Sequence, residues 1–102
     1  MPPKYAVRLL PAAEADFKEV IAYIALDNPS AAGSLAEMIE KNLASLHGHP
    51  LMGKIPDEEH LARMGYRYLV VGNYLIFYII EQRTVWIHRI IHGARDYLPL
   101  FQ

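Results

Sequence analysis

The sequence predicts an α+β fold: an N-terminal strand, an antiparallel helical hairpin, and a three-stranded antiparallel meander that completes a twisted sheet, with a short C-terminal helix or tail. Three observations predict it: an alternating apolar segment at 5–10, two apolar stripes at helical spacing within 11–46, and three apolar runs within 66–91 that are rich in β-branched residues. The length of 102 residues fits one domain, so residues 1–102 are expected to fold as a single unit.

The first strand is expected over 5–10, where the odd-numbered apolar residues share one face. Pro11 suits the first turn of a helix, because its missing N–H has no intrahelical partner there. This helix is expected to end near Asp27, before the Asn28-Pro29 break, and Ser30 is expected to cap the second helix. The short break predicts an antiparallel hairpin. The two core-facing stripes are Phe17, Val20, Ile21 and Ile24, and then Ala32, Leu35, Ala36, Ile39, Leu43 and Leu46.

Residues 47–64 are expected to form a loop that can include one helical turn, because glycines and prolines interrupt the segment and an acidic cluster follows. His47 and His49 form a His-x-His pair, and His60 follows in the same segment. The chain has no cysteine and no matching acid-His spacing, so these histidines are interpreted as polar loop residues. Neither a metal nor a cofactor is expected.

Three strands are expected near 66–71, 74–80 and 84–91. Gly72-Asn73 separates the first two, and such a pair supplies the positive φ values that tight hairpins require. The middle strand is apolar on both faces and is therefore expected to be central, with one face covered by the helical hairpin. The opposite face is expected to be partly bare and open to a partner chain. The place of the first strand in the sheet and the face that His88 occupies stay open.

Charge divides the chain in two. Residues 1–59 carry five Lys/Arg against nine Asp/Glu, whereas residues 60–102 carry five Arg against two acids, and the net charge is -1. This balance argues against a wide nucleic-acid surface, which needs many phosphate contacts. A small anion site near the arginines remains possible, since arginine binds carboxylate and phosphate through two nitrogens. The sequence shows no membrane helix and no apolar signal segment, so a soluble cytoplasmic protein is expected.

The segments GYRYLVVGNYLIFYII and HGARDYL, in the order strand, two helices and three strands, resemble the RelE/ParE superfamily of toxins from bacterial type II toxin-antitoxin modules. The resemblance extends from Tyr5 to Phe101 and is closer to the ParE-like branch. It implies a growth-inhibitory toxin that a tightly bound cognate antitoxin neutralises by wrapping across the helices and the sheet. The partly bare sheet face fits this implied partner.

The resemblance implies two possible activities. RelE-like members are similar to ribonucleases that cut messenger RNA on the ribosome, and on that pattern the catalytic candidates are Arg67, His92, Arg95 and Tyr97. Leu69 and Leu75 stand where RelE-like sequences carry basic residues, and this departure weighs against RNA cleavage. ParE-like members are understood to inhibit DNA gyrase by protein contact. In that case the expected target-binding residues are Arg67, Arg89, His92, Arg95, Asp96 and Phe101.

Each candidate also has a purely structural interpretation. Arg95 and Asp96 can pair with each other at the start of a short terminal helix, and His92 can simply end the last strand. Trp86 and most of the tyrosines are expected to pack in the sheet rather than stack on bases. A third possibility is a non-toxic relic that only binds antitoxin.

Overall fold

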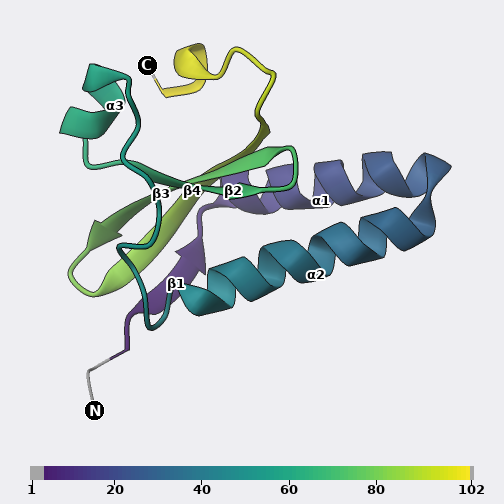
Figure 1. Ribbon diagram of the computed structural model, residues 1–102, viewed down its shortest axis with the longest axis horizontal. Helices are drawn as coiled ribbons and strands as arrows, with labels where there is room; N and C mark the ends of the chain where they lie inside the picture. The colour runs from purple at the N-terminus through teal and green to yellow at the C-terminus, as the bar shows by residue number, and fades with distance from the viewer. Residues whose placement is uncertain (1–3, 102) are drawn as a thin grey trace.

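The computed structural model describes residues 4–101 as one four-stranded sheet with helices on both faces (Figure 1). The order of strands across the sheet is β1-β4-β3-β2. The α+β prediction is therefore confirmed. The elements are β1 (Ala6–Leu9), α1 (Pro11–Asp27), α2 (Pro29–Ser45), α3 (Glu59–Arg63), β2 (Arg67–Val71), β3 (Tyr74–Glu81), β4 (Thr84–His92) and the 3-10 turn η1 (Leu98–Phe101).

Strand β1 lies at one edge of the sheet and pairs with β4 in parallel, from Ala6 opposite Thr84 to Leu9 opposite Ile87. This pairing determines the position of β1 in the sheet, which the sequence left open. A parallel neighbour requires a long crossover, and here the helical hairpin together with β2 and β3 provides it. The other three strands form the predicted antiparallel meander.

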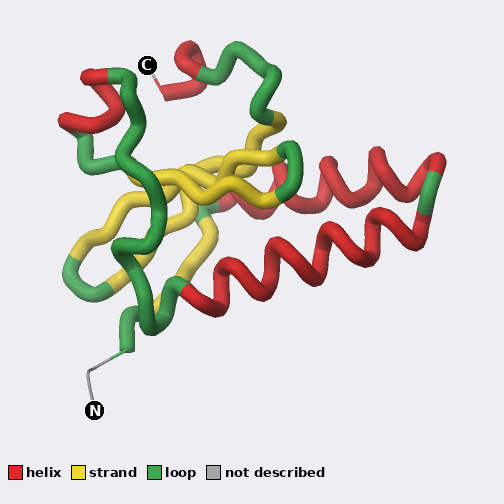
Figure 2. Tube along the Cα trace, in the orientation of Figure 1, coloured by secondary structure: helices red, strands yellow, loops and turns green. Residues whose placement is uncertain are grey.

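Helices α1 and α2 form the predicted antiparallel hairpin, which covers one face of the sheet and extends beyond the strands (Figures 1 and 2). The expected Ser30 cap is wrong. Asn28 is the N-cap of α2, because its Oδ1 accepts a hydrogen bond from the N–H of Ala31 at 3.0 Å and Pro29 occupies the first helical position. No helix within residues 4–101 is long and apolar enough to cross a membrane.

The two hairpin turns use different residues. Gly72 has φ +59° and opens the β2–β3 turn, as a tight turn with glycine in the first central position requires. In the β3–β4 turn both Gln82 and Arg83 have positive φ, 45° and 65°, although neither is glycine. Further along, the β3–β4 register shifts so that Phe77 faces Arg89 and Tyr78 faces Ile87, which leaves His88 as the extra residue of a bulge.

The sheet separates two apolar cores. The first lies under α1 and α2 and includes the fully buried Ile39, Ile76 and Ile87. The second lies on the opposite face, where Leu61 of α3 and Phe101 of η1 pack against Phe77 of β3. The face expected to be partly bare is thus covered over part of its area by α3 and the C-terminal segment, which Figure 1 shows on the side away from the hairpin.

Candidate functional site

The candidate residues do not form one constellation. Arg67 lies opposite Tyr78 of β3, whereas His92 lies opposite Tyr74 of the same strand. Four residues of strand separate these two positions, which is roughly 13 Å at 3.3 Å per residue. Arg67 therefore lies beside the middle of β3 and His92 beside its first residue, and each has its own set of partners.

Arg67 holds the loop that precedes α3. Its Nη1 donates hydrogen bonds to the carbonyl oxygens of Gly53 at 3.0 Å and Leu51 at 3.3 Å. The Tyr78 hydroxyl binds the same loop, because it donates to Pro50 O at 2.8 Å and accepts from the Gly53 N–H at 2.9 Å. Burial raises the pKa of Tyr78, while the Gly53 N–H and the charge of Arg67 act in the opposite direction. These bonds give Arg67 a structural role.

Arg89 is paired with an acid that the sequence analysis did not single out. Its Nε and Nη2 donate to Asp16 of α1 at 2.7 and 2.9 Å, and the N–H of Ile90 donates to the same carboxylate at 2.9 Å. Hydrogen bonding to Asp16 raises the pKa of Arg89 further, despite its partial burial. The side chain of Arg89 is 22% exposed and that of Asp16 is 10% exposed. This two-nitrogen pair joins α1 to β4 and leaves Arg89 little capacity for another anion.

A cleft of about 470 Å³ brings two further candidates, His92 and Arg95, together against α1. Tyr74 of β3 lines it on the sheet side, and the helix contributes the residues Glu19, Val20 and Tyr23. It is shallow and open to solvent, so it suits contact with another macromolecule better than enclosure of a small ligand. Within residues 4–101, the Arg95 side chain forms no ion pair and no hydrogen bond, so the alternative in which Arg95 pairs with Asp96 is not observed.

His92 ends β4 in a fixed orientation. Its Nδ1 accepts a hydrogen bond from the N–H of Ala94 at 3.0 Å, and its ring meets that of Tyr74 edge-on at 5.2 Å between centroids. Since Nδ1 acts as acceptor, the neutral ring carries its hydrogen on Nε2. The N–H of Gly93 donates to Asn73 O at 2.8 Å and ties this end of β4 to the β2–β3 turn. His92 can therefore present one N–H donor beside Arg95.

The other C-terminal candidates lie away from this cleft. The rings of Tyr97 and Phe101 pack against Phe77 at centroid distances of 5.1 and 5.0 Å, and Phe101 also contacts Tyr66 at 4.9 Å. Both side chains are half-buried members of the second core. Asp96 is exposed. Tyr97 and Phe101 thus have a packing role, and the structure brings neither to His92 and Arg95.

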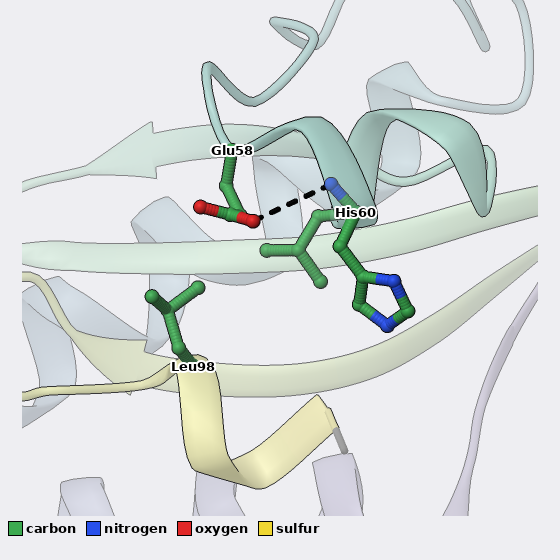
Figure 3. Close-up of a pocket in the computed structure, with 4 residues that line it drawn as sticks. Glu58, His60 and Leu98 are labelled. Atoms are coloured by element: carbon green, nitrogen blue, oxygen red, sulfur yellow. Dashed lines mark hydrogen bonds between the residues drawn. The ribbon is translucent and has the colours of Figure 1, made fainter.

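A second cleft, of about 290 Å³, opens between α3 and η1 (Figure 3). Figure 3 shows the Glu58 carboxylate and the His60 ring on the α3 side and Leu98 across from them. Glu58 is committed to capping α3 through the N–H of His60 at 3.4 Å. No group of three His, Cys, Asp or Glu side chains suited to a metal occurs in the described part of the chain.

The groups around the cleft of His92 and Arg95 are better suited to binding a ligand than to catalysis. A guanidinium and an imidazole N–H beside aromatic and apolar side chains can hold an anionic group next to an apolar one. General acid-base cleavage needs several groups around one reacting phosphate, whereas two of the four catalytic candidates lie elsewhere: Arg67 binds loop carbonyls and Tyr97 packs in the second core. The contribution of α1 was not predicted from the sequence. An acid on its apolar face was the available signal, because Asp16 falls between Ala13 and Val20 at helical spacing.

Comparison with known proteins gives concordant matches. The sequence model of the family described as ParE toxin of type II toxin-antitoxin system, parDE, matches residues 7–97. The chain resembles the fold of a protein from the chromosomal ParDE toxin-antitoxin system of P. aeruginosa, with a TM-score of 0.71 and 15% identity over 86% of this chain and 95% of that one. It also resembles a protein of the RelBE2 toxin-antitoxin complex of Mycobacterium tuberculosis, with a TM-score of 0.60 and 27% identity over 87% and 98% of the two chains. No match is found among curated proteins.

Proposed function

Because the chain belongs to the ParE toxin family of type II toxin-antitoxin systems, we propose that this toxin inhibits DNA gyrase by direct protein contact in the cytoplasm. The observation that carries the proposal is the separation of the candidate groups. Arg67 binds loop carbonyls and Arg89 binds Asp16, so only His92 and Arg95 face a common cleft. That distribution supports contact with a target more than RNA cleavage.

A cognate antitoxin is the second part of the proposal. Both structural relatives come from toxin-antitoxin systems, and they support a partner chain that neutralises this toxin. Several large apolar side chains are exposed, among them Leu26 at 83%, Tyr23 at 74% and Val70 at 55%. Apolar surface of this kind favours burial against another protein.

Purified toxin added to a gyrase supercoiling reaction tests the activity. We expect supercoiling to stop while messenger RNA stays intact in a parallel translation reaction. If messenger RNA is cut in the ribosomal A site and gyrase is unaffected, the ribonuclease alternative is correct instead. Unimpaired growth of cells that express the chain without antitoxin would identify a non-toxic relic.

Arg95→Ala tests the contact residues. We expect the concentration needed for half-inhibition of gyrase to rise at least about tenfold, because arginines at the centre of an interface carry a large share of its binding energy. Arg63→Ala is the matched control. Arg63 is an exposed arginine of α3 that pairs only with Glu59 within the described residues, at 2.8 Å, and its loss should leave inhibition unchanged.

A further inference from the structure

We propose that the cleft formed by α1, the start of β3 and the end of β4 binds a peptide segment of the target. This segment carries a carboxylate next to an apolar side chain, and the cleft discriminates against a phosphodiester chain. This inference rests on the proposed function and specifies the chemistry of the contact. Its residues are Glu19, Val20, Tyr23, Tyr74, His92 and Arg95.

The apolar part of the proposed ligand follows from the exposure of α1. Tyr23 is 74% exposed although it lies beside the half-buried Val20 and Tyr74 in the cleft lining. The hairpin extends past the sheet (Figure 1), so the outer half of α1 has no strand beneath it to cover such side chains. An apolar side chain inserted between the two tyrosines would bury surface that water now contacts.

The carboxylate of the proposed ligand follows from the hydrogen-bond donors of Arg95 and His92 that have no partner within residues 4–101. Arg95 has no partner within residues 4–101, and the Ala94 N–H fixes the His92 tautomer so that Nε2–H is available. Together they offer charge-assisted hydrogen bonds to a carboxylate. Both donors lie on the C-terminal side of the cleft, because His92 is the last residue of β4 and Arg95 lies in the connection 93–97 that leads to η1.

Charge balance decides between a carboxylate and a phosphodiester chain. Glu19 lines the same cleft as Arg95, so the formal charges of the lining cancel when His92 is neutral. Asp16 neutralises Arg89 of β4, and Glu19 adds to the negative field there. Nucleic-acid sites depend on an excess of positive charge over several phosphates, which this cleft lacks. One carboxylate of the bound peptide can pair with Arg95, while a hydrogen-bond donor on the same peptide binds the Glu19 carboxylate.

Variants of three cleft residues and two controls test the inference. The measurements are inhibition of gyrase supercoiling and binding of a single-stranded RNA 20-mer. Tyr23→Ala removes the exposed apolar wall and Arg95→Gln removes the charge. Met38→Ala, on α2 at 45% exposure, and Arg63→Gln, on α3, are matched controls. Glu19→Gln removes the acid of the cleft lining. Equal far-UV circular dichroism and unfolding midpoints establish that all five variants fold.

We expect Tyr23→Ala and Arg95→Gln each to weaken gyrase inhibition at least about tenfold, and the controls to change it less than about twofold. Wild-type toxin should bind the RNA weakly, and Glu19→Gln should strengthen that binding by removing repulsion. If wild-type toxin inhibits gyrase but Tyr23→Ala and Arg95→Gln inhibit it equally well, the inference is wrong and the proposed function stands. Tight RNA binding that Arg95→Gln abolishes also overturns the inference. If wild-type toxin does not inhibit gyrase, the proposed function itself is wrong.

Discussion

At the residue scale, Gly53 is required by the close approach of a tyrosine. A Cβ atom at this position would lie 2.7 Å from Cε1 and 2.9 Å from Cζ of Tyr78, and closer still to its hydroxyl oxygen. The Tyr78 ring is fully buried and its hydroxyl is bound to Pro50 and Gly53, so it cannot move away without losing those bonds. The loop carrying Gly53 thus depends on a residue without a side chain.

We predict that Gly53→Ala destabilises the protein by about 1–3 kcal/mol, the usual cost of forcing an extra carbon into a packed region. Urea unfolding followed by circular dichroism measures the change. Gly33→Ala is the control, since its added Cβ would meet nothing within 4 Å and alanine favours a helix interior by about 0.5–1 kcal/mol. Equal stability of the Gly53→Ala variant and the wild type would contradict the steric argument.

At the element scale, the Asp16–Arg89 pair joins α1 to β4 beside the β-bulge. The bulge lets Arg89 reach the helix side even though it is registered opposite Phe77, a residue of the second core. Asp16 accepts three hydrogen bonds, so its charge is fully paired. Loss of either partner leaves a charge in a partly buried site.

We predict that Asp16→Ala or Arg89→Ala alone lowers the free energy of unfolding by about 3 kcal/mol, because each leaves its partner uncompensated. The double variant should lose less than the sum, with a coupling energy of about 1–3 kcal/mol in a double-mutant cycle. Glu59 and Arg63 form the control pair, at side-chain exposures of 81% and 74%, and their coupling should stay below about 0.5 kcal/mol. Equal couplings for the two pairs would show that burial is not the cause.

The same elements show what the sequence could predict. Helical stripes and turn residues predicted α1, α2 and the meander, because local periodicity reports which face is buried. The parallel β1–β4 pairing and the bulge depend on contacts far apart in the chain, such as Leu9 with Ile87. For that reason the arginines could be placed on strands from the sequence, while the partners that occupy Arg67 and Arg89 could not.

At the scale of the whole molecule, the second core depends on a segment far along the chain. Tyr66, which precedes β2, contacts Phe101 and also shares a hydrogen bond with the Nδ1 of His88 at 3.0 Å. Burial lowers the pKa of His88 below 6.5, although the charge of Glu81 opposes this, and burial raises the pKa of Tyr66. In the folded protein at neutral pH, the phenol can therefore donate to an uncharged imidazole.

This link predicts how global stability depends on pH. Because the pKa of His88 is lower in the folded protein than in the unfolded chain, the unfolded chain binds a proton first as pH falls below about 6.5. The contribution of His88 to stability is thus complete above that pH and is lost progressively as pH falls toward the folded pKa.

We predict that the free energy of unfolding falls less steeply between pH 7 and 5 in His88→Gln, which keeps a hydrogen-bonding group but cannot take up the proton. Urea titrations at several pH values measure the slope, with His49→Gln at an exposed loop position as control. A slope that His88→Gln leaves unchanged would mean that His88 does not set the acid sensitivity of the fold.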